Sequence, residues 1–411
     1  MPFRLWAGMI LASAAFGYCA EPPDSLEDLV REMIESNPSL RAAQYRLDAA
    51  LKRPSQAGTL PDPKLSITNL GVGHPFSRLG QSDFAYQGFG VSQEIPFPGK
   101  LALAEEEARK EAGIERGMYR AARLDAVGQL KAVYYDWFGT AKTIEITRKN
   151  RTLLESFEEI ARARYSVGKG LQQDILKAQV EESALAQRLE ILEQRKATAE
   201  NRIRSLLNSN RPLQGPAEVA FEPLRWSLDE LLSTLHRNSP RLEAQQASID
   251  ARSTGITRAR KDYRPDFAFN FQWQKTGAPF PDYYMASAEV KIPIYFWRKQ
   301  RLAVEEAAAR YQQARSDYMA SRQDLEFQVK ELYLAATTAE RLMALLRDAL
   351  IPQSSLALES GLASYQVGST DFLTLLNNSM SVLTYEMQYI DELVKHAQAR
   401  ARIESLIGEL K

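Results

Sequence analysis

The sequence predicts a mainly α-helical protein with a membrane β-barrel part, built from two copies of one strand-strand-helix-helix unit. Three observations support this prediction. The second half of the 411-residue chain repeats landmarks of the first half at an offset of about 200 residues. Each half contains two long stretches dense in helix-forming residues. Each half also contains two short stretches in which apolar and polar residues alternate, as they do in β-strands.

The repeat is visible in short motifs that keep their order in both halves. Ser-Leu-Glu-Asp-Leu at 25–29 returns as Ser-Leu-Asp-Glu-Leu at 227–231. Tyr-Ser-Val-Gly at 165–168 returns as Tyr-Gln-Val-Gly at 365–368. Such a long period indicates two half-molecules and not a solenoid of short repeats.

The N-terminus has the pattern of an export signal. Arg4 precedes an apolar stretch from Leu5 to Phe16, and small residues follow, which predicts a signal peptide over residues 1–20. Cys19, the only cysteine, lies at the end of this segment, so we expect no disulfide in the exported chain. Two interpretations of Cys19 remain open. It is either the lipidated first residue of a lipoprotein or a leader residue that is removed with the signal.

Proline and glycine divide the rest of the chain into two repeats. Segment 212–226 is rich in both residue types and is the natural linker. We therefore place the first repeat at 21–211 and the second at 227–411. Each repeat is expected to begin with shorter helices, near 25–57 and 227–262.

Four long helices are expected from composition. The region between residues 99 and 211 contains no proline and is dense in Ala, Glu, Arg, Leu and Gln, which favour helices. The expected long helices are 100–165, 171–208, 298–365 and 371–410. The first would be about 100 Å long at about 1.5 Å per residue. Pro352 lies within the third and should kink or divide it.

The last helix carries a heptad seam of apolar residues, and the second helix of the first repeat carries a similar one. Such seams pack two helices together, so we expect antiparallel coiled-coil hairpins and no cofactor in the seam. Glu182 and Lys196 interrupt the first-repeat seam. The seam of the last helix consists of Leu376, Met380, Leu383, Met387, Ile390, Val394, Ala397 and Ala401.

Four segments are expected to be strands, near 64–70, 84–95, 266–274 and 283–294. The clearest is the third, in which four aromatic residues alternate with polar ones and would face lipid. An alternative is a small soluble sheet lying on the helices. Because lipid does not tolerate open strand edges and the smallest barrels have about 8 strands, a barrel would require several chains. The aromatic residues are Phe267, Phe269, Phe271 and Trp273.

Composition and motifs argue against catalysis, a cofactor, a metal site or a nucleic-acid partner. The chain has 52 basic and 52 acidic side chains, and no basic stripe with interleaved aromatic residues is present. The three histidines are far apart in sequence and near no acidic or cysteine cluster. Gly99 and Lys100 resemble the end of a phosphate loop, but Leu101 stands where Ser or Thr is required. We therefore predict that the protein is not an enzyme.

Taken together, these features resemble the TolC-like outer-membrane efflux proteins, the exit ducts of tripartite export systems. The resemblance covers residues 25–411 and depends on the duplicated plan, the Ile-Pro-Phe-Pro-Gly-Lys-Leu segment at 95–101 and the two Tyr-x-Val-Gly turns. It implies a homotrimer in the bacterial outer membrane, where four strands from each of three chains close a twelve-stranded barrel. The long helices would form a periplasmic α-helical tunnel, and a periplasmic adaptor and an inner-membrane pump would be partners.

The resemblance also implies roles for individual residues. The two Val-Gly turns would lie at the periplasmic tip, where an adaptor docks. An alternative is that both glycines only permit positive φ at the helix reversals, and the two interpretations can hold together. The docking residues implied by the resemblance are Tyr165, Val167, Gly168, Tyr365, Val367 and Gly368.

Relatives often place acidic side chains just after the second turn, as a constriction that favours cations. The corresponding candidates here are Asp174, Asp371, Thr374 and Asn377. Thr374 and Asn377 depart from the acidic pattern. Asp174 would form a ring of three carboxylates, or it is a solvated charge at a helix start.

The transported substrate is less defined than the fold. The compact length and the Pro-Phe-Pro-Gly-Lys segment resemble the branch that exports heavy-metal cations, which implies a role in metal resistance. Ducts for drug efflux and type I protein secretion share the fold and remain alternatives. A non-channel periplasmic coiled-coil scaffold is the alternative from another class.

Overall fold

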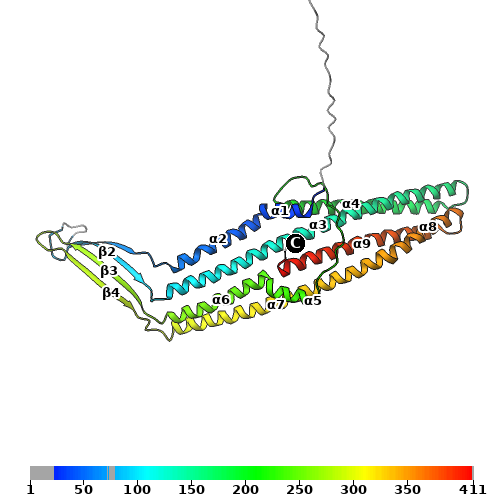
Figure 1. The fold of residues 1–411 in the computed structure, drawn as a ribbon. Helices are drawn as coiled ribbons and strands as arrows, with labels where there is room; N and C mark the ends of the chain where they lie inside the picture. The colour runs from blue at the N-terminus through cyan, green and yellow to red at the C-terminus, as the bar shows by residue number, and fades with distance from the viewer. Residues whose placement is uncertain (1–22, 72, 74–78, 410–411) are drawn as a thin grey trace, which may run out of the picture.

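The computed structural model describes residues 23–71, 73 and 79–409, which form an elongated helical bundle with a four-stranded sheet at one end (Figure 1). The signal peptide predicted at 1–20, including Cys19, lies outside the described residues. Every helix in the described ranges lacks the sustained apolar stretch that a transmembrane helix requires.

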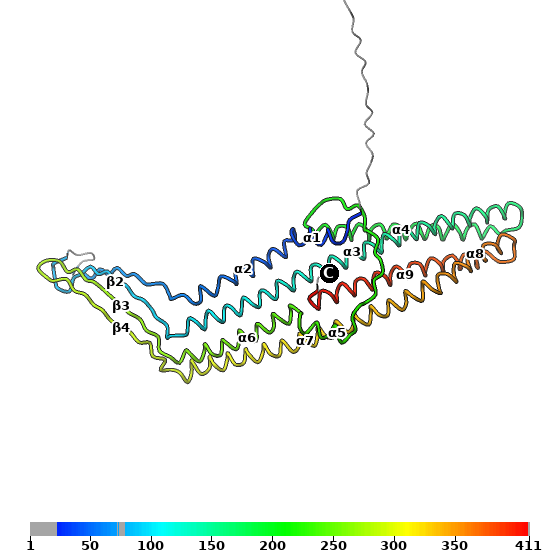
Figure 2. Tube along the Cα trace, viewed as in Figure 1, coloured from blue at the N-terminus to red at the C-terminus, as the bar shows by residue number. Residues whose placement is uncertain are grey.

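The two halves of the chain have the same order of elements. In the first half these are α1 (Leu26–Ser36), α2 (Pro38–Gly58), β1 (Lys64–Leu70), β2 (Tyr86–Ile95), α3 (Lys100–Ser166) and α4 (Gln172–Leu207). In the second half they are α5 (Leu228–Asn238), α6 (Pro240–Lys261), β3 (Asp266–Lys275), β4 (Tyr283–Lys291), α7 (Gln300–Leu345), a π-helical turn (Leu346–Leu350), α8 (Ile351–Val367) and α9 (Phe372–Ile407). Figure 2 shows both halves running from the sheet, through the middle of the bundle, to the far tip.

Each half begins with two short helices that meet at a proline. Asn37 ends α1 and caps α2, and its side chain accepts hydrogen bonds from the backbone of Ser39 and Leu40. Pro38 then occupies the first turn of α2, where its missing N–H costs nothing. Ser239 and Pro240 occupy the matching positions between α5 and α6, although the Ser239 side chain does not cap α6. A break therefore occurs at the same place in both copies.

The proline in the long helix of the second half does not end it. The π-helical turn ends at Leu350, two residues before Pro352, and α8 continues to Val367. A wider turn frees the backbone carbonyl that the proline ring would otherwise hit. The expected division at Pro352 is therefore a local irregularity in a continuous rod.

The heptad seams form the cores of the two hairpins. Leu185, Leu192 and Ile203 of α4 are buried, as are Leu383 and Met387 of α9. Side chains of both hairpins also meet in one apolar cluster near the tip, which includes the following buried residues: Leu154, Phe157, Ala161, Ala178, Leu185, Tyr365, Phe372, Leu375, Leu376, Leu383 and Met387. Glu182, which interrupts the apolar seam of α4, forms an ion pair with Arg151 of α3 at 3.0 Å.

The four strands form one antiparallel sheet in the order β1-β2-β3-β4. Residues directly opposite each other on paired strands have side chains on the same face. One row across the sheet consists of Leu65, Val91, Phe271 and Ala286, and the next consists of Ile67, Phe89, Trp273 and Tyr284. The apolar face predicted from β3 therefore extends over all four strands. The opposite face carries polar residues such as Ser66, Asn270 and Gln272.

Candidate channel tip and tunnel lining

The two helix reversals at the far tip have the same backbone. The amides of Gly168 and Gly368 donate to the carbonyls of Tyr165 and Tyr365, at 3.0 and 3.1 Å. Both glycines have positive φ, 72° and 83°. That conformation is unfavourable for other residues, so each glycine is required by the turn itself.

The reversals differ in what they leave exposed. Val167 and Val367 project from the tip with 66% and 81% of their surfaces exposed. Tyr165 is 48% exposed, whereas Tyr365 is only 2% exposed. The exposed members of the predicted docking set are therefore the two valines, the two glycines and Tyr165. Tyr365 lies inside the tip.

Arg164 of α3 holds Tyr365 in this buried position. Its guanidinium group donates to the Tyr365 carbonyl and lies 4.5 Å from the centre of the Tyr365 ring. It also donates to the carbonyl of Lys169 in its own turn, at 3.2 Å. One side chain of the first hairpin thus contacts both turns, and we call this contact the Arg164 clasp. Sequence reasoning missed Arg164, although the second copy has Ser364 at the matching position.

Asp174 adds a second contact between the hairpins. The hydroxyl of Tyr365 donates to Asp174 Oδ2 at 3.3 Å. Burial, together with the nearby Asp174 carboxylate, raises the pKa of Tyr365 to about 12. The tyrosine therefore remains a hydrogen-bond donor at physiological pH. Asp174 is half-buried and engaged in this contact, which favours neither a free carboxylate ring nor a fully solvated charge.

The other constriction candidates lie on one exposed face of α9. Asp371 caps the helix by accepting from the Thr374 amide at 2.9 Å, and hydrogen bonds from Thr374 lower the pKa of Asp371. Asp371, Thr374 and Asn377 are spaced three apart and are all exposed. Thr384 and Gln388 continue this exposed polar face along the helix. The face is polar, and Asp371 supplies its only charge among these five residues.

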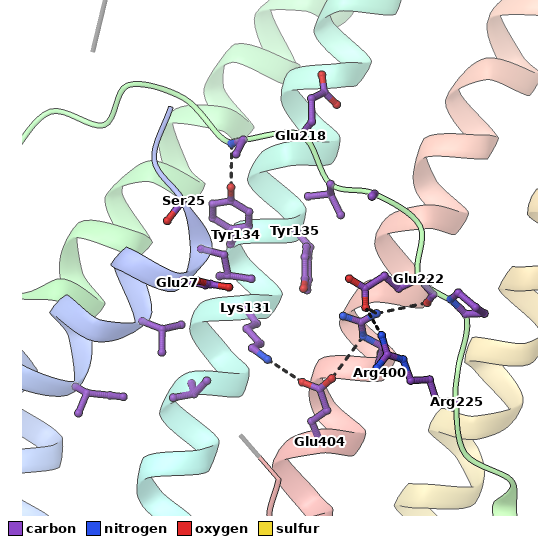
Figure 3. A pocket seen from close by; sticks show the side chains of 18 of the residues that line it. Ser25, Glu27, Lys131, Tyr134, Tyr135, Glu218, Glu222, Arg225, Arg400 and Glu404 are labelled. Carbon is purple, nitrogen blue, oxygen red and sulfur yellow. Dashed lines mark hydrogen bonds and ion pairs between the residues drawn. The ribbon is translucent and has the colours of Figure 1, made fainter. Parts of the chain in front are cut away.

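The segment between the repeats runs across the middle of the bundle (Figure 1) and lines a cavity of about 730 Å³ (Figure 3). Tyr134 of α3 holds it there, because its hydroxyl accepts from the Ala217 amide at 2.9 Å. Lys131 and Glu404 form a buried ion pair at 2.7 Å between α3 and α9. Arg400 joins Glu404, at 3.5 Å, to Glu222 of the segment, at 2.8 Å. These charges have protein partners, so we assign them to holding the segment in place.

No group of three or more His, Cys, Asp or Glu side chains suited to a metal ion occurs within the described ranges. His236 and His396 each contact a glutamate instead, Glu326 at 2.7 Å and Glu340 at 3.0 Å.

The comparison with known families decides the identity. The model of the family described as "Outer membrane efflux protein" matches the chain twice, over residues 29–209 and 231–409. This chain belongs to that family. The double match agrees with the duplicated plan, and family members are trimeric channels of the outer membrane. The predictions of an outer-membrane location, a passive efflux channel and no enzymatic activity are confirmed.

Individual relatives of this efflux protein are distant in sequence. It is 21% identical to the pyoverdine export outer membrane protein OpmQ of Pseudomonas putida over 77% of this chain and 69% of the relative. The outer-membrane channel OprN superposes with a TM-score of 0.81 at 17% identity, covering 100% of this chain and 98% of OprN. CusC superposes with a TM-score of 0.82 at 15% identity, covering 94% and 92%. These likenesses confirm the fold, in which the sheet is one third of a trimeric barrel and the helices form the tunnel. Membership of the outer membrane efflux family, together with this fold, excludes the soluble-sheet and scaffold alternatives.

Proposed function

We propose that this efflux channel docks through its tip onto a periplasmic adaptor of an inner-membrane pump and conducts heavy-metal cations outward. The observation that carries the docking proposal is the pair of exposed valines at the reversals, Val167 and Val367. Apolar side chains exposed at a tip, here together with Leu171, are suited to packing between the helices of a partner. The docking surface consists of Tyr165, Val167, Gly168, Val367 and Gly368.

The Arg164 clasp keeps the tip closed at rest in this proposal. It joins the two hairpins of one protomer through the Tyr365 carbonyl and ring, and Asp174 adds the hydroxyl contact. An adaptor that packs on the adjacent valines would separate the hairpins and break these contacts. Opening then requires no chemistry at the tip, and the pump supplies the energy.

The exposed face of α9 that contains Asp371, Thr374 and Asn377 would line the tunnel near its entrance. Three Asp371 carboxylates, one from each chain of the trimer, would stay ionised because hydrogen bonds from Thr374 lower the pKa of each. A ring of negative charge favours cations over anions. The neutral residues Thr374 and Asn377 would let hydrated ions pass without binding them tightly.

The likeness to OpmQ favours a second candidate substrate, a siderophore-like organic solute. The polar, uncharged part of the α9 face suits such a solute as well as a hydrated ion. A drug-efflux or type I secretion role would use the same duct. The identity of the partner pump separates these substrates.

Single-channel recording in planar bilayers tests the proposal. The reconstituted trimer should conduct in rare openings and select cations, and Asp371→Asn should reduce the cation preference without changing trimer assembly. Expression in a cell that lacks its own exit duct should then restore tolerance to zinc or copper salts. Restoration of siderophore export without metal tolerance would favour the second candidate, and anion selectivity would contradict the acidic ring.

A further inference from the structure

Two connections between strand and helix lie at the end of the sheet that meets the helices. They differ in whether their cations have acidic partners. In the first, between β2 and α3, Lys100 is only 12% exposed and binds Asp266 at 2.8 Å and Asp262 at 3.5 Å. The Phe97 amide donates to the same Asp266 carboxylate at 2.9 Å. The positive charge of Lys100 in the first connection is therefore paired with acidic side chains of the same chain.

The second connection, between β4 and α7, is exposed and carries three aromatic residues in a row. Tyr295, Phe296 and Trp297 have between 49% and 64% of their surfaces exposed, and Ile294 before them is 58% exposed. Tyr263, which follows α6, lies against Phe296 with ring centres 6.4 Å apart. We call Ile294–Trp297 the aromatic turn. It continues the apolar face of β4 toward the helices.

Six cations lie in the chain segments next to the aromatic turn, around the end of α6 and the start of α7. Of these, within the described ranges, only Arg301 has an ion pair, 3.4 Å from Glu305 in the next turn of α7. Lys261 and Arg264 lie over the Phe97 ring, at 5.7 and 5.9 Å. Both acids of this region, Asp262 and Asp266, already bind Lys100. The six, which we call the cationic collar, are Arg260, Lys261, Arg264, Arg298, Lys299 and Arg301.

The cationic collar lies where the helices meet the sheet, and this position determines which ligands can reach it. Helices α6 and α7 pack side by side, and Figure 2 shows the end of one and the start of the other at the bend where the helices meet the sheet. The helices extend into the periplasm, so this end of the sheet lies at the periplasmic leaflet of the outer membrane. Aromatic side chains favour the membrane–water boundary, and unpaired cations beside them attract anionic headgroups.

We propose that the cationic collar and the aromatic turn bind the phosphate groups of anionic phospholipids in the periplasmic leaflet. The aromatic residues would lie at the acyl boundary, and Arg298, Lys299 and Arg301 would contact the headgroup phosphates. A trimer would carry three such sites. This binding would fix the depth of the sheet in the membrane, and it does not depend on which substrate the channel carries.

The test uses the purified trimer, incubated in mild detergent with equal amounts of phosphatidylglycerol and phosphatidylcholine. Native mass spectrometry counts the lipids that stay bound. Each cation near an anionic surface contributes about a fivefold preference, so the native trimer should retain mostly phosphatidylglycerol. This preference should weaken between about 0.05 and 0.5 M NaCl because salt screens exposed charges. Equal retention of the two lipids by the native trimer would overturn the proposal without any variant.

Two matched triple variants locate the site. Arg298→Ser, Lys299→Ser and Arg301→Ser together should bring the lipid ratio close to one. Arg310→Ser, Arg315→Ser and Lys330→Ser remove the same charge farther along α7 and should leave the ratio unchanged. If both variants behave alike, the collar is not the binding site.

A neighbouring subunit is the rival occupant of this surface. In that case the collar variant would weaken SDS-resistant trimers while the lipid ratio stayed native, and the proposal would fail. Conductance recorded from the same samples distinguishes loss of lipid binding from loss of the channel itself.

Discussion

The two helix reversals at the tip share a sequence motif and a backbone, yet one tyrosine is exposed and the other is buried. Tyr165 and Tyr365 accept the same hydrogen bond from the glycine of their turn. They differ because Arg164 precedes the first tyrosine and Ser364 precedes the second. The guanidinium group crosses to Tyr365, whereas no cation of the described ranges lies over the Tyr165 ring. Phe372, where the first copy has Gln172, also packs against Tyr365, with ring centres 5.5 Å apart. The turn is therefore the same in both copies, while differences at two positions leave one tyrosine exposed and the other buried.

The sheet shows a similar difference between the copies. Strand β3 has four aromatic residues on the apolar face, whereas β1 has Leu65 and Ile67 there. The register places Leu65 and Phe271 in the same row, at the same depth. Both copies therefore contribute apolar side chains to the same face of the sheet, but those of β1 are aliphatic and those of β3 are aromatic.

The largest expected effect is a failure to assemble. Changing Phe269 and Phe271 together to Lys should block insertion, because each cation on the lipid face costs about 2 to 4 kcal/mol near the membrane centre. Heat-modifiable trimers in outer-membrane fractions provide the measurement. Asn270→Lys with Gln272→Lys, on the opposite face of the same strand, should assemble.

The first copy should respond to the same kind of substitution. Leu65→Lys with Ile67→Lys should also block assembly, because these residues lie in the same rows as aromatic residues of β3. Normal assembly of this variant would show that the apolar face of the first copy does not meet lipid.

Loss of export with intact trimers is the next largest effect. Gly168→Glu with Gly368→Glu should abolish export, since each side chain adds charge at the docking surface and about 1 to 2 kcal/mol of strain at positive φ. Gly215→Glu also places a charged side chain at positive φ, 127°, but in the segment between the repeats and away from the tip, and it is the control. Export is measured by substrate accumulation and trimers by SDS gels. Export by the double variant at the native rate would rule out docking at the turns.

The clasp itself should show a smaller effect, on channel opening. Arg164→Ala removes a charged hydrogen bond and a stacked cation, together worth about 2 kcal/mol, so openings should become about 30-fold more frequent in planar bilayers. Arg162→Ala, which loses only an ion pair to Glu158 within α3, should behave as native.

The two tyrosines can be compared directly in the same recording. Tyr365→Phe removes the hydroxyl contact to Asp174 and should raise the opening frequency several-fold, whereas Tyr165→Phe should not. The pKa of Tyr365 is raised to about 12 in the closed tip, compared with about 10 for a tyrosine in water. Above about pH 10, ionisation therefore favours the state in which the contact to Asp174 is broken, and openings should increase there. Equal effects of the two Phe variants would contradict the asymmetry of the tip.

The smallest expected effect is a pH dependence of stability that belongs to the second copy alone. His396 of α9 corresponds to Lys196 of α4 and is 2% exposed. Burial lowers the pKa of His396, although Glu340 opposes the shift and Arg400 adds to it. The unfolded chain then binds the proton more tightly, so stability is complete above about pH 6.5 and falls as the pH decreases below it.

Thermal unfolding of the trimer between pH 7.5 and 5 measures this dependence, over a range set by the ordinary histidine pKa of about 6.5. His396→Gln should flatten the fall, and Lys196→Gln should leave it unchanged. A fall that persists in the His396 variant would assign it to another group.

Much of the fold could be predicted because its signals are local or periodic. The motif Ser-Leu-Glu-Asp-Leu marks a capped helix start by itself, and the heptad seam of α9 was readable residue by residue. The continuity of the helix through Pro352 could not be predicted, because a π-helical turn depends on the packing around it. The burial of Tyr365 was missed for a related reason, since Tyr165 carries the same local sequence signal.

The duplicated plan, the elements, the apolar seams and the aromatic face of β3 could be predicted because each depends on residue order within one segment. Which of two repeated residues has a bonding partner depends on the folded arrangement of the two halves. Arg164 and Tyr365 are 201 positions apart, and Lys131 and Glu404 are 273 apart. Charge pairing and burial at such separations depend on how the two hairpins lie together, and no local pattern carries that information.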